Sequence, residues 1–173
     1  MQKLLLITLT ILLVLAGCSN WSTKQSIESP TPAGPRISSV SVVTASADMT
    51  EIPVGGFGDA IVKVKVQNGY HINANPPSFP YLKATELDIP DTEEISINNT
   101  YYPPPLVKKF SFAQDQPLRV YEGETQLKVA LEAAKTAGKG ERSLPGTLSI
   151  QACDDQVCYA PGSIAIAIPV RIK

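Results

Sequence analysis

Three cysteines are the residues of this sequence with the most distinctive chemistry: Cys18, Cys153 and Cys158. Cys18 ends an apolar leader, whereas Cys153 and Cys158 lie only five positions apart near the C-terminus. On a helix, residues at that spacing would point about 140° apart. At the two ends of a hairpin with a four-residue loop they would face each other, with Cβ atoms about 4.5–5.5 Å apart, close to what a disulfide requires. The spacing therefore favours a disulfide-bonded hairpin, and an exported protein would keep such a bond.

The pair has two possible uses, as a staple or as a redox couple. A structural bond that closes so short a loop contributes only about 2 kcal/mol by loop-closure entropy, and a domain of this size has core enough without it. A disulfide at a hairpin tip is expected to be exposed, which suits exchange with other thiols. The spacing alone leaves both uses open.

The N-terminal residues predict export and lipid attachment. Lys3 precedes an apolar run that is too short to span about 30 Å of hydrocarbon as a stable anchor and fits a secretory signal. The run ends in the tetrapeptide LAGC at 15–18, which resembles the bacterial lipobox, whose cysteine carries diacylglycerol. We therefore expect a signal peptide at 1–17 and a lipid on Cys18 that anchors the mature protein to a membrane.

The predicted organisation continues with a tether and one domain. The segment 18–36 begins at the lipidated cysteine, is rich in Ser, Thr and Pro, and reads as a flexible tether. A single domain is expected at 37–173. Ser19 favours the outer over the inner membrane under the enterobacterial sorting rule. The predicted location is the bacterial cell envelope, facing the periplasm.

Composition excludes several classes of function. A net charge of −1 and a pI near 5.8 provide no basic surplus to neutralise phosphates, so no nucleic-acid partner is expected. His71 is the single histidine, which excludes a His-rich metal site. A zinc site built from Cys153, Cys158 and His71 would lack a fourth ligand. No metal or other cofactor is expected.

Short apolar alternations separated by Gly, Pro and Asn predict an all-β domain. About eight such strands favour an antiparallel β-sandwich of the immunoglobulin-like kind. One stretch is ambiguous, because 125–137 contains good helix formers, and we expect a strand to about Leu131 followed by a loop. The predicted strands are 39–45, 60–67, 86–89, 94–98, 118–121, 127–131, 147–152 and 164–172.

Three segments resemble one known family. The most specific is GTLSIQACDDQVCYAP at 146–161, with its Gln-x-Cys and Cys-Tyr-x-Pro blocks. Two weaker ones are NGYHINAN at 68–75, followed by Thr85-Glu86-Leu87, and VYEG at 120–123. Over about residues 40–172 the sequence resembles the N-terminal periplasmic domain of the thiol:disulfide interchange protein DsbD.

The resemblance implies a fold, an activity and partners. The family domain is an immunoglobulin-like sandwich whose cysteine pair passes reducing equivalents between a membrane electron carrier and periplasmic thioredoxin-like proteins. The second cysteine, here Cys158, would form the mixed disulfide with the partner, and Cys153 would resolve it. This chain is expected to stand alone on its tether and to take electrons from another protein.

The resemblance also implies a cap over the pair. The best-known members have a cysteine spacing one residue longer and a Phe-bearing acidic cap motif that we do not identify in this sequence. The equivalent stretch is assigned to 98–109, where Tyr101 or Tyr102 would shield the disulfide.

Several other residues are candidate neighbours of the pair. Asp154 and Asp155 lie between the cysteines, and their charge should raise the thiol pKa values. His71 is aligned near the disulfide, where a neutral imidazole could accept a thiol proton; the alternative is a surface or strand-end histidine. Asn73 and Tyr159 are weaker candidates.

The competing hypothesis is a non-catalytic immunoglobulin-like binding or assembly module with a structural Cys153–Cys158 bond. The reduction potential separates the two, because structural disulfides lie below about −300 mV and exchanging ones higher.

Overall fold

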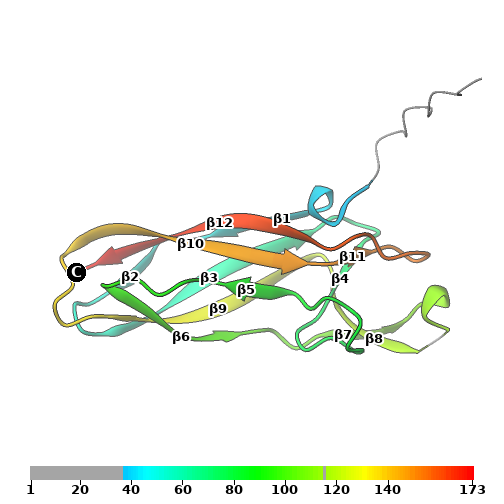
Figure 1. The fold of residues 1–173 in the computed structure, drawn as a ribbon, viewed down its shortest axis with the longest axis horizontal. Helices are drawn as coiled ribbons and strands as arrows, with labels where there is room; N and C mark the ends of the chain where they lie inside the picture. The colour runs from blue at the N-terminus through cyan, green and yellow to red at the C-terminus, as the bar shows by residue number, and fades with distance from the viewer. Residues whose placement is uncertain (1–36, 115) are drawn as a thin grey trace, which may run out of the picture. The chain divides into compact units, whose positions relative to one another are not determined.

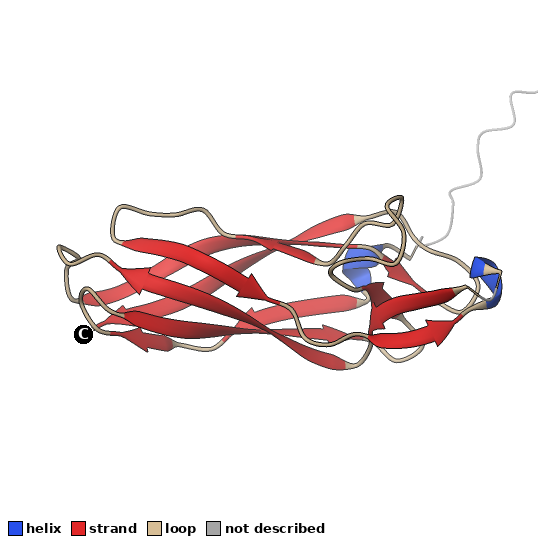
Figure 2. Cartoon of the chain, turned by 90° about the horizontal axis from the view of Figure 1, so that it is seen from below, coloured by secondary structure: helices blue, strands red, loops and turns tan. Residues whose placement is uncertain are grey.

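The computed structural model describes residues 37–114 and 116–173, and their fold is an antiparallel β-sandwich (Figure 1). Two short 3-10 helices, η1 (Ser39–Ser41) and η2 (Ser111–Ala113), interrupt the strands and lie in the half of the sandwich away from the C-terminal residue (Figure 2). No helix in this part of the chain is long and apolar enough to cross a membrane. The strands are β1 (Val43–Ala47), β2 (Thr50–Ile52), β3 (Phe57–Val66), β4 (His71–Asn73), β5 (Glu86–Asp88), β6 (Ile95–Tyr101), β7 (Leu106–Lys109), β8 (Pro117–Tyr121), β9 (Glu124–Ala133), β10 (Gly140–Ile150), β11 (Ala152–Cys153) and β12 (Gly162–Ile172).

The strands form three four-stranded sheets. Two of them, in the orders β1-β3-β9-β6 and β2-β12-β10-β5, make the sandwich. The third, in the order β11-β4-β8-β7, carries the cysteine segment and forms one end of the domain. Adjacent strands of this third sheet all pair antiparallel. In the sandwich, β12 and β2 pair in parallel.

The core follows from period-2 alternation. Val62 and Val64 on β3 are buried and pair across the ladder with Leu127 and Thr125 on β9. Leu144 on β10 pairs with Ile168 on β12, and both are buried. Each such side chain contributes about 1.5–3 kcal/mol when it leaves water. The predicted sandwich is confirmed. The expectation for the ambiguous stretch 125–137 is confirmed as well, because β9 stops at Ala133 and a loop follows.

Two predicted strands differ from the structure. The strand expected at 39–45 begins instead as η1, because the side chains of Ser38 and Ser41 bond each other's backbone in a capping box. Val40 is therefore exposed and does not share a buried register with Val42. The strand expected at 147–152 starts earlier, at Gly140, and ends at Ile150.

The chain changes sheets directly after that strand. Gln151 interrupts β10, and Ala152 then pairs with Ile72 of β4 in the third sheet. Sequence patterns also missed β2, β4 and β7, which have three, three and four residues and are too short for a periodic signal.

The third sheet lies between two hydrophobic clusters. On one face, Ile72, Tyr121 and Ala152 belong to the main core. On the other face, Leu118 and Val120 join Phe110 in a second cluster, with Phe79, Leu82, Phe112 and Ala113 packed against it. We call this second group the cap cluster. Because side chains alternate along a strand, Cys153 and His71 leave the sheet on the face that the cap cluster covers.

Candidate functional site

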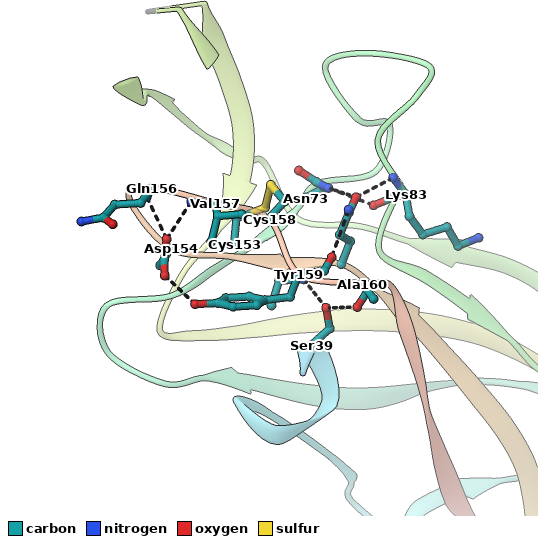
Figure 3. Close-up of a disulfide and its surroundings, with 12 residues drawn as sticks. Ser39, Asn73, Lys83, Cys153, Asp154, Gln156, Val157, Cys158, Tyr159 and Ala160 are labelled. Carbon is teal, nitrogen blue, oxygen red and sulfur yellow. Dashed lines mark hydrogen bonds between the residues drawn. A yellow bond between two sulfur atoms is a disulfide. The ribbon is translucent and has the colours of Figure 1, made fainter. Parts of the chain in front are cut away.

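Cys153 and Cys158 are joined by a disulfide with an S–S distance of 2.01 Å. The two residues face each other as an antiparallel bridge, and the Asp154 N–H donates to the carbonyl of Val157 at 2.9 Å to close the loop between them. The hairpin predicted from the spacing is confirmed (Figure 3).

The two cysteines differ in their exposure. Cys153 is completely buried, whereas Cys158 is partly exposed and Val157 beside it is 49% exposed. The expectation that the whole pair would be exposed is therefore wrong for Cys153. The reason is that β11 pairs with β4 beneath the cap cluster, so Cys158 but not Cys153 reaches solvent.

Asp154 holds the loop in shape. Its Oδ1 accepts hydrogen bonds from the backbone N–H groups of Gln156 and Val157, both at 2.8 Å, and its Oδ2 accepts one from the Tyr159 hydroxyl. These bonds, the one from Tyr159 foremost, lower the pKa of the Asp154 carboxyl. The same contact raises the pKa of Tyr159 to about 12. Asp154 therefore caps the loop as well as placing a charge beside the pair.

Gln151 connects the base of the loop to its surroundings. Its Oε1 accepts hydrogen bonds from Asn73 Nδ2 and from the Lys83 N–H, both at 3.1 Å, and its Nε2 donates to the Tyr159 carbonyl at 3.2 Å. Asn73 also donates from Nδ2 to the Lys83 carbonyl at 3.2 Å. Sequence analysis did not select Gln151 as a site residue, although it begins the most specific block of the resemblance.

Ser39 forms the second clamp at the base of the loop. This buried residue of η1 accepts a hydrogen bond from the Ala152 N–H at 2.9 Å and donates to the Ala160 carbonyl at 2.6 Å (Figure 3). Ala152 and Ala160 flank the cysteine loop on its two arms. A serine in a Ser-rich stretch gives no sequence signal for this role.

His71 lies directly opposite Cys153 in the β4–β11 ladder. It is only 2% exposed, and its ring stacks on Phe110 with centroids 4.1 Å apart. Burial lowers the pKa of the imidazole, while the carboxylates of Glu122 and Asp155 oppose that shift. His71 is the first residue of β4, so the strand-end alternative describes its position, but the surface alternative is wrong because β4 is covered by the cap cluster. The Nε2 atom is buried and has no hydrogen-bond partner in the described part of the chain.

The cap comes from a different segment than expected. Phe110 is the N-cap of η2 and Phe112 lies within η2; their ring centroids are 5.5 Å apart, and both rings stack with His71. The Ser111 hydroxyl donates to the Asp155 carbonyl at 3.3 Å, which joins this turn to the cysteine loop. The stretch assigned to the cap, 98–109, ends just before these residues.

Tyr101 and Tyr102 do not shield the disulfide. Tyr101, at the end of β6, is 49% exposed and lies under the Lys128 ammonium, 4.9 Å from its ring centroid. The Tyr102 hydroxyl accepts a hydrogen bond from the Leu87 N–H at 3.0 Å. Both are held by the main sandwich, because Tyr101 pairs with Lys128 of β9 and Tyr102 packs against the main core.

An open cleft of about 550 Å³ adjoins the loop. Its lining includes Tyr70, His71 and Asp155, and Lys108 with its ion-pair partner Glu122 forms another wall. His71 thus lines a cleft whose walls carry charges of both signs.

The family comparison matches most of the chain. The model of the family "Thiol:disulfide interchange protein DsbD, N-terminal" matches residues 42–168. No curated protein matched the sequence.

Two solved structures of similar domains accompany that match. One is the N-terminal periplasmic domain of ScsB from Proteus mirabilis, with 15% identity over 73% of this chain and 46% of that one and a TM-score of 0.52. This chain thus spans less than half of that structure. The other is the reduced N-terminal domain of DsbD from Neisseria meningitidis, with 17% identity over 75% and 86% and a TM-score of 0.40. The fold is the predicted immunoglobulin-like β-sandwich.

Proposed function

We propose that this chain passes reducing equivalents between partner proteins through the Cys153–Cys158 pair, because it belongs to the family of N-terminal domains of the thiol:disulfide interchange protein DsbD. Thiol–disulfide interchange is the activity of the family. The observation that supports its assignment to this pair is a disulfide with one buried and one partly exposed cysteine at the edge of the domain.

The difference in exposure supports a division of roles. A partner thiolate attacks Sγ of Cys158, a bond forms between these sulfurs, and the Cys153–Cys158 bond breaks. The electron pair of the broken bond remains on Cys153, which takes up a proton. A second partner thiol then displaces Cys158, so the pair gains two electrons and the partner leaves as a disulfide. The reverse sequence reduces the next protein.

We place this exchange in the bacterial cell envelope. The leader at 1–17 and the LAGC sequence ending at Cys18 support export and a lipid anchor, with Ser19 favouring the outer membrane; these residues lie outside the described part of the structure. The partners in this proposal are thioredoxin-like proteins of the periplasm and a membrane electron carrier.

The reduction potential of the pair tests the function. The full-length protein is equilibrated with glutathione or dithiothreitol buffers and alkylated, and the tryptic peptide 143–171, which carries both cysteines, is quantified by mass spectrometry. A potential of about −200 to −270 mV, in the range of exchange proteins, supports the shuttle. A value below about −300 mV indicates a structural bond and favours the binding or assembly module.

A further inference from the structure

His71 is a buried polar residue whose Nε2 atom has no hydrogen-bond partner among residues 37–114 and 116–173. An unpaired buried polar group destabilises the folded state, whereas an apolar ring of similar size would pack on Phe110 without that cost. The imidazole is therefore retained at the expense of stability. Such an orphaned group indicates a task outside the resting, oxidised state.

The position of His71 identifies the atom on which it acts. Residues directly opposite each other in an antiparallel ladder have Cβ atoms about 4.5–5.5 Å apart and side chains on the same face. The residue opposite His71 is Cys153, which is also completely buried. When the disulfide is reduced, the Cys153 thiol becomes a new donor and acceptor beside the imidazole. Reduction would thus create the partner that His71 lacks.

Charged groups surround the imidazole unequally. The carboxylates of Glu122, Asp155 and Asp154 favour its protonated form, whereas Lys108 opposes it. Glu122 and Lys108 form an ion pair, which offsets part of their separate effects. Burial is the largest influence and holds the pKa of His71 below its usual value of 6.5, so the ring is neutral near pH 7. A neutral imidazole is the form that accepts a proton.

We propose that His71 takes the proton from the Cys153 thiol in the step that resolves the mixed disulfide. This proposal rests on the proposed function. With Cys158 bonded to a partner, the imidazole accepts the thiol proton, and the Cys153 sulfur attacks Sγ of Cys158. The Cys153–Cys158 bond forms, the bond from Cys158 to the partner breaks, and the partner sulfur leaves with the electron pair. The chain is oxidised and the partner is reduced, and the imidazolium later returns its proton to water.

The physical need for this base comes from the burial of Cys153. Desolvation raises the pKa of a buried thiol, and the neighbouring carboxylates of Asp154 and Asp155 act in the same direction. Little thiolate would form unaided near neutral pH, and the thiolate is the attacking species. Cys158 is partly exposed and does not depend on His71 in this way.

The test separates the two cysteine steps with a coloured aromatic disulfide, dithiobisnitrobenzoate. The mature protein, in which the proposed lipid blocks the Cys18 sulfur, is reduced and mixed with one equivalent of reagent. The first release of coloured thiolate reports attack by Cys158, and the second reports displacement by Cys153. Cys153→Ala should give the first release alone, which assigns the phases. Because the reagent replaces the partner, a failure of partner transfer and a failure of the His71 role are distinguishable.

Two variants remove the base in different ways. His71→Gln keeps a polar side chain, and His71→Phe keeps an aromatic ring against Phe110. Both should slow the second phase at least tenfold at pH 7 and leave the first within twofold. Tyr102→Phe is the matched control, because it removes a hydrogen bond in the main sandwich without touching the pair. It should change neither phase.

The pH profile of the unmodified protein is a second test that needs no variant. With His71 as base, the second-phase rate falls below the pKa of the imidazole and levels off above it. Without such a base, the rate rises tenfold per pH unit until the thiol pKa, about 8.5 or higher. A second phase that keeps its speed in His71→Gln, or that follows the thiol titration alone in the unmodified protein, overturns the proposal.

Discussion

Ser39 lies 113 positions before Ala152 in the sequence, yet its hydroxyl accepts the Ala152 N–H at 2.9 Å. The same hydroxyl donates to the Ala160 carbonyl, so one side chain joins both arms of the cysteine loop. The residue that does so stands only three positions beyond the predicted tether at 18–36. The start of the described sandwich and both arms of the cysteine loop are therefore one hydrogen-bonded unit.

Ser39→Ala should destabilise this unit. The substitution leaves the buried Ala152 N–H without a partner, and such a loss costs about 1–3 kcal/mol. The free energy of unfolding, measured in urea with the disulfide intact, should fall by that amount. Ser46→Ala removes an exposed hydroxyl from the neighbouring strand β1 and should cost less than about 1 kcal/mol. Equal losses in the two variants would contradict a special role for Ser39.

Phe112→Ala should make the disulfide easier to reduce. Phe112 is partly exposed and packs on the cap cluster, so its loss thins the cover over Cys153 without emptying the main core. We expect the rate of reduction by dithiothreitol to rise several-fold. Tyr101→Ala is the control for the originally expected cap and should leave the rate unchanged. Faster reduction in Tyr101→Ala but not in Phe112→Ala would indicate that the cap lies within 98–109.

The Asp154–Tyr159 contact should be visible in titrations. Its loss in Tyr159→Phe removes the largest cause of the lowered Asp154 pKa, so that pKa should rise towards 3.8, as measured by carboxyl NMR. Because the folded pKa lies below the unfolded value, the contribution of Asp154 to stability is present above the unfolded pKa and is lost as pH falls through the folded one. Tyr159→Phe should therefore lose less stability than the unmodified protein as pH falls below the unfolded pKa of Asp154, because its folded pKa lies closer to the unfolded one. An unchanged Asp154 titration would contradict the contact.

Trapping should distinguish the two cysteines. Cys153→Ala leaves the more exposed thiol without a resolving partner, so mixed disulfides with envelope proteins should accumulate. Cys158→Ala leaves a buried thiol and should trap little. Non-reducing electrophoresis of membranes from cells expressing each variant measures the difference. Equal yields, or trapping by Cys158→Ala alone, would reverse the assigned roles.

Local patterns predicted much of the frame. Alternation along β3, β9, β10 and β12 could be read directly, because a residue buried on one face repeats every second position. The five-residue cysteine spacing predicted the hairpin, because a short loop leaves few ways to bring both sulfurs together. Short strands such as β4 gave no such repeat, and their residues were assigned by resemblance alone.

The residues that surround the cysteines were harder to predict from sequence. The resemblance directed attention to His71 and Asn73, but not to whether either is buried. Gln151 belongs to the Gln-x-Cys block, but the sequence did not indicate its hydrogen bonds. Nothing in the sequence indicated that Ser39, Phe110 and Phe112 lie near the cysteines. Each acts through contacts between residues distant in the chain, for which one sequence carries no periodic signal.

The sequence by itself determined that the chain forms a β-sandwich and that Cys153 and Cys158 close a hairpin, because both depend on spacing within a few residues. Only the tertiary structure decided that Cys153 is buried, that His71 faces it and that phenylalanines rather than Tyr101 or Tyr102 cover it. Those outcomes depend on which strands pair in the third sheet and which loop folds over its outer face. Cross-strand pairing and burial there are fixed by the packing of the whole domain.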